Sequence, residues 1–285
     1  MVNIYEAGPF EGRLEQWPVL ATSGALEVRL AETEHEVEQA QRLRYTVFYE
    51  EMGAIPSPQM RDLRRDFDKY DDVCDHLLVV DRDTHDEDGQ PLVVGTYRLT
   101  REQDARRAGG FYTSSEYDLS LMLKGLATQE SGQATKYLEL GRSCVLKSYR
   151  SRPGTMQLLW KGLMAYVARF DIDLMFGCAS LPGIDVQELA MPLSYLHHFH
   201  PMPELLRVKA RPELLVDMNR IGKDQIDARE GLRSLPPLLK GYVRAGCCIG
   251  EGAVIDRQFG TTDVFIYFPL SGIDARYKSR FGLVK

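Results

Sequence analysis

The sequence predicts an α/β fold, and three observations support this prediction. Residues 26–30 (Leu-Glu-Val-Arg-Leu) alternate apolar and polar side chains, which is typical of a half-buried strand. Residues 33–36 (Thr-Glu-His-Glu) have the form of a capping box, which opens a helix. From Met156 to Phe170, apolar residues recur at spacings of three and four, which indicates an amphipathic helix. Strand and helix patterns therefore alternate along the chain, as they do in α/β proteins.

The first half of the chain begins with the strand and helix just described. That helix is expected to run to about Gly53, with Arg44 at the edge of its apolar stripe. Two strands are expected at 76–80 and 93–99, and the polar residues from Arg82 to Gln90 between them are expected to form the hairpin connection. A leucine-rich segment at 119–126 is expected to be helical.

The second half continues the alternation. A strand is expected at 137–145, and Pro153 suits the first turn of the helix that follows it. Later patterns predict, in order, a strand at 174–178, a helix at about 186–198, a strand at 207–210, a short helix beginning within 235–239, and a strand at 264–268. We expect three parts, namely an N-terminal segment at 1–25, an α/β core at 26–200 and a C-terminal α/β extension at 201–285 packed on the core.

The composition excludes several classes of protein. Of the 285 residues, 44% are hydrophobic and 27% are charged, which excludes a disordered chain. No apolar run approaches the roughly 20 residues that cross a bilayer, and residues 1–16 lack the basic and apolar regions of a secretory signal. The net charge of −6 argues against a general nucleic-acid binder. We therefore expect a cytoplasmic protein that binds no nucleic acid.

Five cysteines agree with that compartment. Cys74, Cys144 and Cys178 lie in apolar surroundings, and Cys247 and Cys248 are adjacent. This arrangement matches neither a disulfide framework nor a paired Cys-x-x-Cys zinc site. We expect buried thiols and no metal.

Two charges interrupt the otherwise apolar strand at 137–145 (Tyr-Leu-Glu-Leu-Gly-Arg-Ser-Cys-Val). In a regular strand Glu139 and Arg142 face opposite sides, because side chains alternate with period two. The two side chains can share one site only if the strand bulges, and Gly141 is suited to a bulge. The alternative is an internal ion pair, or two charges at the strand end that reach solvent. The sequence leaves both interpretations open.

A basic run follows in the same region. Residues 142–169 contain six Lys and Arg residues and no Asp or Glu. Within this run, residues 150–155 (Arg-Ser-Arg-Pro-Gly-Thr) connect a strand to a helix, so backbone N–H groups and the positive end of the helix dipole could face an anion. Together these features predict a phosphate-bearing ligand, and the alternative is a solvated basic surface.

Three other patterns resemble binding sites. His76 and Asp81 have the H-x-x-x-x-D spacing of glycerolipid acyltransferases, but in one strand they face opposite sides, so we interpret the match as coincidence. The three histidines within 197–200 suggest a metal cluster, yet adjacent helix residues diverge, which favours hydrogen bonds at a helix end. The acidic segment 66–72 lacks the spacing of a calcium loop. It forms either a solvated turn or a binding site for a cationic substrate.

Four motifs resemble those of acyl-homoserine-lactone synthases, which belong to the GCN5-related N-acetyltransferase superfamily. They are Arg44-x-x-Val47-Phe48, Asp66-Phe67-Asp68-Lys69-Tyr70-Asp71, Gly95-Thr96-Tyr97-Arg98-Leu99 and Glu139-Leu140-Gly141-Arg142. Motifs at 176–183, 193–198, 235–242 and 252–256 are similar to a closer family, the L-ornithine Nα-acyltransferases of ornithine-lipid synthesis, sometimes labelled hemolysin-like. The resemblance covers about residues 26–282.

The resemblance implies a fold and a reaction. The fold is that of GCN5-related N-acetyltransferases, with a mixed central sheet and helices on both faces. The reaction moves a β-hydroxyacyl group from acyl carrier protein to the α-amino group of ornithine and gives lyso-ornithine lipid. The donor is a thioester on phosphopantetheine, so no permanently bound cofactor is expected. Acyl carrier protein is acidic and would dock on the basic run, and any membrane association would be peripheral, at the inner face.

The motifs and the resemblance assign three groups of site residues. Glu139 is the expected base for the attacking amine, and backbone N–H groups near Gly141 to Cys144 are expected to bind the oxyanion. The expected catalytic group is Glu139, Gly141, Arg142, Ser143 and Cys144. The expected phosphopantetheine-binding group is Val145, Lys147, Arg150, Arg152, Gly154 and Thr155. The expected amino-acid-binding group is Arg44, Phe48, Asp66, Asp68, Asp71 and Arg98.

Three alternatives differ in mechanism. An acyl-homoserine-lactone synthase that uses S-adenosylmethionine is disfavoured, because such enzymes are usually shorter and lack a counterpart of the 230–285 motifs. An acetyltransferase that uses acetyl coenzyme A is disfavoured by Pro153, which stands where the common cradle has its first glycine. A lipid- or carrier-binding protein without catalysis would not need Glu139.

Overall fold

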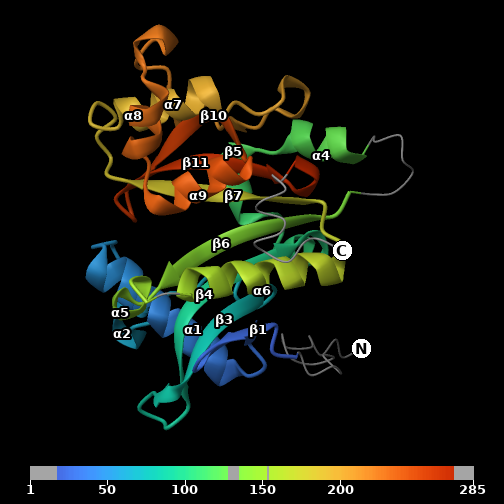
Figure 1. Cartoon of the computed structure of the whole chain (residues 1–285), viewed down its shortest axis with the longest axis vertical. Coiled ribbons are helices and arrows are strands. Elements are labelled where there is room, and N and C mark those ends of the chain that lie inside the picture. The colour runs from blue at the N-terminus through green and yellow to red at the C-terminus, as the bar shows by residue number, and fades with distance from the viewer. Residues whose placement is uncertain (1–17, 128–134, 153, 273–285) are drawn as a thin grey trace, which may run out of the picture. The chain divides into compact units, whose positions relative to one another are not determined.

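The computed structural model describes residues 18–127, 135–152 and 154–272 (Figure 1). The chain forms two compact units, and each consists of two separate stretches of sequence. Unit 1 contains Met1–Gly110 and Leu140–Phe170, and unit 2 contains Phe111–Glu139 and Asp171–Lys285. The boundaries expected at residues 25 and 200 describe a different division, and they stay predictions.

Unit 1 contains strands in the order β1-β2-β3-β4-β6, with antiparallel pairing from β1 to β4. They are β1 (Ala21–Ser23), β2 (Leu26–Leu30), β3 (Asp75–His85), β4 (Pro91–Arg101) and, from Leu140 onward, β6 (Tyr137–Val145). The strands expected at 76–80 and 93–99 are confirmed, but the expected connection is too long. Residues 82–85 belong to β3 and His85 pairs with Pro91, because an exposed hairpin end does not need apolar side chains.

The first helix of unit 1 is α1 (Glu34–Tyr45). Its predicted N-cap is confirmed, because the Thr33 hydroxyl accepts a hydrogen bond from the Glu36 N–H at 3.2 Å. The chain then continues as a π-helix, η1 (Thr46–Glu51), so the helix expected to reach about Gly53 ends two residues earlier with a changed winding. The other helices are α2 (Pro58–Leu63), α3 (Glu102–Arg107), α5 (Lys147–Arg150) and α6 (Thr155–Phe170).

Helices α1 and α6 cover opposite faces of these strands. Leu78 and Val80 of β3 pack with Leu43 of α1. The alternate residue Leu77 faces α6, because a Cβ atom added at Gly162 of α6 would lie 3.3 Å from Leu77 Cδ1. Figure 1 shows α6 lying across the strands of unit 1. The expected arrangement of helices on both faces is confirmed for this unit.

Unit 2 contains a mixed sheet. The first residues of β6 pair in parallel with β7 (Leu174–Pro182), whereas β11 (Thr261–Pro269) is antiparallel to both β7 and β10 (Cys248–Asp256). Three short strands extend it, β5 (Tyr117–Asp118), β8 (Lys209–Ala210) and β9 (Leu215–Val216). The strand β10 was not predicted, because glycines break its pattern and its register shifts between Ile249 and Ala253. Gly252 there has φ +80°, a conformation that glycine adopts readily.

The helices of unit 2 follow the expected order with shorter bounds. The helix expected from about residue 186 begins at Ala190, because Asp185 accepts a hydrogen bond from the Gln187 N–H and holds the preceding residues in a turn. The strand expected at 207–210 contains only two residues, those of β8. The helical segments are η2 (Tyr112–Ser115), α4 (Ser120–Ala127), α7 (Ala190–Phe199), η3 (Glu204–Leu206), η4 (Lys223–Gln225), α8 (Ala228–Ser234), α9 (Pro237–Ala245) and η5 (Leu270–Gly272). Within the described ranges, no helix combines the length and the apolar composition needed to cross a bilayer.

Candidate active site

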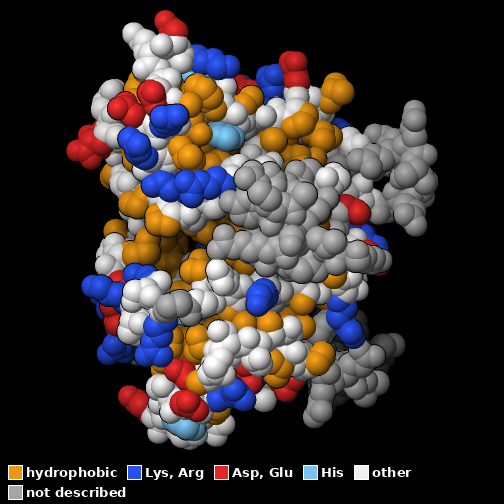
Figure 2. All heavy atoms as spheres, viewed as in Figure 1, with side chains coloured by type: hydrophobic (Ala, Val, Ile, Leu, Met, Phe, Trp, Pro, Cys, Tyr) orange, Lys and Arg blue, Asp and Glu red, His pale blue; other side chains and the backbone are white. Residues whose placement is uncertain are grey.

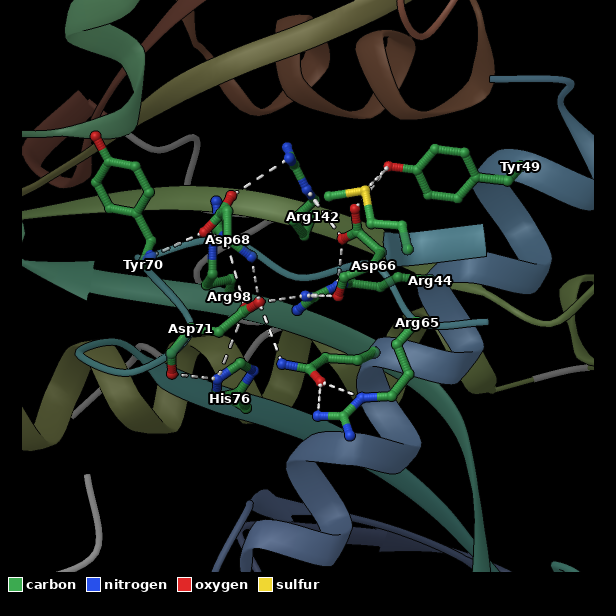
Figure 3. Close-up of polar contacts among 12 residues, drawn as sticks. Arg44, Tyr49, Arg65, Asp66, Asp68, Tyr70, Asp71, His76, Arg98 and Arg142 are labelled. Carbon is green, nitrogen blue, oxygen red and sulfur yellow. Dashed lines mark hydrogen bonds and ion pairs between the residues drawn. The ribbon is translucent and has the colours of Figure 1, made fainter. Parts of the chain in front are cut away.

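Three arginines and three aspartates form a charge cluster in unit 1 (Figure 3). The cluster joins Arg142, which was expected in the catalytic group, with five residues of the expected amino-acid-binding group. They come from α1, from the loop after α2, from β4 and from β6. The members of the charge cluster are Arg44, Asp66, Asp68, Asp71, Arg98 and Arg142. Of the four aspartates in the acidic segment, Asp66, Asp68 and Asp71 bind guanidinium groups, so the segment is no solvated turn.

Arg44 lies at the centre of the charge cluster and is 0% exposed. Its Nε donates to Asp66 Oδ2 at 2.7 Å, and its Nη2 donates to Asp71 Oδ2 at 2.7 Å. Burial alone would raise the pKa of Asp71, but the charges of Arg44 and Arg98 outweigh burial and hold that pKa below its ordinary value. The pKa of Asp66 is likewise lowered, against burial, by Arg44 and Arg142. We therefore treat Arg44 as a residue that positions the two carboxylates.

Asp68 and Arg142 form the accessible edge of the charge cluster, since their side chains are 22% and 13% exposed. Arg142 Nη2 lies 3.4 Å from Asp68 Oδ2, and Arg142 Nε lies 3.2 Å from Asp66 Oδ2. Buried Arg98 donates from Nη1 to Asp68 Oδ1 at 2.7 Å, and its guanidinium lies 5.4 Å from the centre of the Tyr70 ring. The side chains of Asp68 and Arg142 are the most exposed members of the charge cluster.

The backbone of β6 departs from the extended conformation between Glu139 and Val145. The break is at Arg142, whose φ is +49°, one residue after the position expected for a bulge. A left-handed conformation costs a residue with a side chain roughly 1–2 kcal/mol, and the two ion pairs of Arg142 offset this strain. Gly141 lies beside Arg98, because a Cβ atom added there would be 3.8 Å from Arg98 Nε.

Glu139, in unit 2, is buried and holds the start of η2. Its Oε2 accepts a hydrogen bond from the Tyr112 N–H at 3.0 Å, and its Oε1 accepts one from the Thr113 N–H at 2.7 Å. Backbone N–H groups at the start of a helical turn lack hydrogen-bond acceptors within the turn. Here the carboxylate of Glu139, on β6, is the acceptor for two of them. Sequence analysis missed these partners, because they lie 27 and 26 residues before Glu139.

Cys144, Val145 and Phe48 are core residues of unit 1. Cys144 packs with Leu43 of α1, Phe48 packs against the same core, and Val145 is buried. Burial raises the pKa of the Cys144 thiol to about 12, so this thiol is not a nucleophile at neutral pH. Ser143, between the break in β6 and Cys144, is half-buried. The side chain of Cys144 is structural, and only its backbone remains available for the expected oxyanion role.

The residues expected to bind phosphopantetheine divide into exposed and buried positions. Lys147, Arg150 and Arg152 are exposed. Arg150 Nη2 also pairs with Glu51 Oε2 at 2.5 Å, and Arg152 Nη1 lies 3.5 Å from Asp81 Oδ2. Thr155 at the start of α6 is buried, and its hydroxyl has no hydrogen-bond partner among the residues that the structure describes. Gly154 before it has φ +99°, and Pro153 lies outside the described residues.

Sequence analysis missed two residues beside the charge cluster. The Tyr49 hydroxyl donates to Asp66 Oδ1 at 3.0 Å. Buried His76 Nε2 lies 3.1 Å from the backbone oxygen of Asp71. A signal for His76 existed, because it stands two residues before Leu78 and therefore faces α1. Asp81 instead accepts a hydrogen bond from the Tyr149 hydroxyl at 2.7 Å, so the spacing of His76 and Asp81 is a coincidence, as expected.

The histidines within 197–200 also form the hydrogen bonds expected of them. His198 Nε2 lies 3.0 Å from the Ile221 backbone oxygen, and His200 Nε2 lies 3.1 Å from the Tyr195 hydroxyl. A closer grouping of metal-ligand types is Asp71, Cys74 and His76. Two arginines already bind Asp71, and their charges disfavour a cation there.

The titration of His76 should make stability depend on pH. Burial lowers its pKa to about 4, so the unfolded chain, with an ordinary pKa of about 6.5, binds the proton first as pH falls. The stability of the wild type is therefore fully present above pH 6.5 and should fall by up to about 3 kcal/mol toward pH 4.

The His76→Gln variant tests this prediction, because glutamine keeps an N–H donor for Asp71 but does not titrate. Urea unfolding from pH 7.5 to 4.5 should show a shallower pH dependence for the variant. His197 and His200, whose pKa values burial also lowers, remain in both proteins, so the difference isolates His76. Parallel pH curves would contradict the prediction.

Comparisons with curated proteins show the family of this chain. The family model of the acetyltransferase (GNAT) domain matches residues 43–161. The chain is 44% identical to an L-ornithine Nα-acyltransferase of Rhizobium meliloti over 93% of this chain and 86% of the relative. It is 45% identical to one of Brucella abortus over 93% and 91% of the two chains. Among solved structures, FeeM, an N-acyl amino acid synthase from uncultured soil microbes, has a TM-score of 0.47 at 11% identity over 86% of this chain and 92% of its own. This chain, with its GNAT fold, belongs to the family of L-ornithine Nα-acyltransferases.

Proposed function

We propose that this protein transfers an acyl group from the phosphopantetheine thioester of acyl carrier protein to the α-amino group of ornithine, giving lyso-ornithine lipid. The relatives with matching lengths are named for acylation of this amino acid at this position. The observation that carries the proposal on the structural side is the charge cluster, whose accessible edge presents one carboxylate and one guanidinium.

The charge cluster suits an amino-acid substrate. The charges of its three arginines and three aspartates cancel, so the cluster does not strongly attract a ligand that carries only negative or only positive charge. A substrate that carries an ammonium group and a carboxylate finds a partner for each at Asp68 and Arg142. Arg44, Asp66, Asp71 and Arg98 are buried behind this edge and hold it in place.

Acyl transfer requires a base and an oxyanion site. A neutral amine attacks the thioester carbonyl, and a group near the nitrogen takes the released proton, directly or through water. We assign this role to Glu139, whose carboxylate is held in a fixed position by two backbone N–H groups. The backbone N–H groups that follow the break in β6 are the proposed oxyanion donors, since a left-handed residue re-aims the amides around it.

Product analysis tests the proposed function. The full chain is incubated with acyl carrier protein thioester and either ornithine or S-adenosylmethionine, and the product is identified by mass. We expect Nα-acylornithine only. A lactone would contradict the proposal in favour of a homoserine-lactone synthase. Thiol release from acetyl coenzyme A, without release from acyl carrier protein, would favour an acetyltransferase.

The carrier protein is proposed to dock on the exposed cations of α5 and of the turn that follows it, namely Lys147, Arg150 and Arg152. Reversing two charges in an Arg150→Glu, Arg152→Glu variant should raise the KM for acyl carrier protein by at least about tenfold at low salt, because exposed charges attract most strongly there. The difference from wild type should shrink at high salt. The control is Arg229→Glu, an exposed residue in the first turn of α8. Carrier docking at these residues would be contradicted if the increase in KM did not depend on salt. It would also be contradicted if the Arg229→Glu control showed the same increase.

A further inference from the structure

The connection between η1 and α2 exposes large apolar side chains. Met52 is 49% exposed, Ile55 is 64% exposed and Leu63, at the end of α2, is 51% exposed. Single exposed apolar side chains are ordinary on protein surfaces, but three within twelve consecutive residues are a local concentration. We call residues 52–63 the apolar turn.

The apolar turn is an ordered element. The Ala54 N–H donates to the Phe48 backbone oxygen at 2.9 Å, and Ala54 itself is buried. Ser57 caps α2 by accepting a hydrogen bond from the Met60 N–H at 3.2 Å. Ile55 therefore protrudes between two anchored positions, and its exposure is a built feature of unit 1.

Cationic side chains surround the apolar turn. Arg64, next to Leu63, pairs with Glu50, and Arg150 of α5 pairs with Glu51, so these contacts join α2, η1 and α5. Figure 2 shows Lys and Arg side chains gathered over α2 and α5. Five exposed cations of this surface accompany three carboxylates, in a chain whose net charge is −6. They are Arg61, Arg64, Lys147, Arg150 and Arg152, with Glu50, Glu51 and Asp62.

We propose that the apolar turn docks this protein on the surface of an anionic phospholipid bilayer. Met52, Ile55 and Leu63 would enter the boundary between headgroups and acyl chains, while the arginines contact phosphates, which is how peripheral proteins combine apolar burial with charge. A bilayer accepts protruding side chains anywhere on its surface, whereas a folded partner would need a matching groove. The chemistry therefore favours lipid over a protein as the occupant.

Vesicle flotation with the full chain tests the proposal without any substrate. We expect binding to vesicles of phosphatidylglycerol and phosphatidylethanolamine, weak binding to phosphatidylcholine vesicles, and a decline as salt rises from about 0.1 to 0.5 M. An Ile55→Ser, Leu63→Ser variant should lower the partition coefficient by at least roughly tenfold, because two side chains no longer favour the apolar boundary.

A matched control removes equally large exposed side chains elsewhere. Leu205 in η3 is 88% exposed, and Leu214 is also exposed. A Leu205→Ser, Leu214→Ser variant should bind vesicles within about twofold of wild type. Absence of vesicle binding, or an equal loss in both variants, would overturn the proposal. A variant at Ile55 and Leu63 that loses affinity for acyl carrier protein but keeps vesicle binding would assign the apolar turn to the carrier and overturn it as well.

The two serine variants separate membrane docking from the proposed function, although both proposals involve Arg150 and Arg152. Both serine variants should acylate ornithine in detergent solution at the wild-type rate, because neither changes a residue of the charge cluster or Glu139. Vesicle binding without acyl transfer would contradict only the proposed function. Acyl transfer without vesicle binding would contradict only the docking proposal.

Discussion

Replacing Glu139 with glutamine should lower the turnover number by at least roughly 100-fold, because a general base contributes about 10²–10⁴-fold to a proton-transfer step. Glutamine has the same length but cannot take the proton of the attacking amine. It also turns one hydrogen-bond acceptor of the Tyr112 and Thr113 N–H groups into a donor, so some loss of stability is expected too. The measurement is the turnover number with saturating acyl carrier protein thioester and ornithine.

The pH–rate profile distinguishes a base from a residue that only holds η2. If Glu139 takes the proton, the pH–rate profile of Glu139→Gln should differ in shape from that of the wild type. If Glu139 only positions η2, the variant should keep the shape of that profile while its melting temperature falls. Turnover within tenfold of wild type would exclude Glu139 as the base.

Replacing Arg44 with methionine should destabilise unit 1 by about 3 kcal/mol, since two buried carboxylates lose their nearest cation and keep only the longer contacts with Arg142 and Arg98. Here two carboxylates, Asp66 and Asp71, lose the guanidinium that each binds at 2.7 Å. Urea unfolding at neutral pH measures the effect. Arg44→Lys should fall between wild type and Arg44→Met, because an ammonium group keeps the charge but not the planar fork of donors.

The control for Arg44 is an exposed ion pair of the same chemistry. Arg64 pairs with Glu50 at the surface, so Arg64→Met should change stability by less than about 1 kcal/mol. The pKa values of Asp66 and Asp71 are lowered in the fold, so the stabilisation that they contribute is present above about pH 4 and is lost as pH falls further. The difference in the free energy of unfolding between wild type and Arg44→Met should become smaller as pH falls below about 4. If wild type and Arg44→Met have nearly the same free energy of unfolding at neutral pH, the charge cluster does not stabilise the fold.

The sequence predicted the members of the charge cluster but not their partners. The resemblance named Arg44, Asp66 and Arg98, whereas spacing alone left the acidic segment as a solvated turn or a substrate site. Arg44 is separated from Asp66 by 22 residues, and Arg142 from Asp66 by 76, and no local pattern encodes such pairing. Burial decides the outcome, because charged groups removed from water must find each other.

The limits of local sequence patterns also explain which parts of the fold were not predicted. Periodic apolar positions identified α6, which buries one face, and a continuous apolar run identified β11, which is buried on both faces. The same rule missed β10, whose Gly250 and Gly252 carry no side chain to mark a face. It also could not show the break in β6, since the residue with positive φ is Arg142 and not the neighbouring glycine that the pattern favoured.

The discontinuous units constrain the order in which the protein can fold during synthesis. Tyr117, which is fully buried in unit 2, donates its hydroxyl to the backbone oxygen of Asp263, 146 residues later. Phe111 and Tyr117 therefore leave the ribosome before their partners in β7 and β11 exist, whereas unit 1 has all of its strands once residue 145 has emerged. Contacts so distant in sequence form slowly, and their partners stay exposed meanwhile. We expect nascent chains halted near residue 200 to hold a folded unit 1 and to need chaperone protection of apolar residues such as Phe111 and Tyr117.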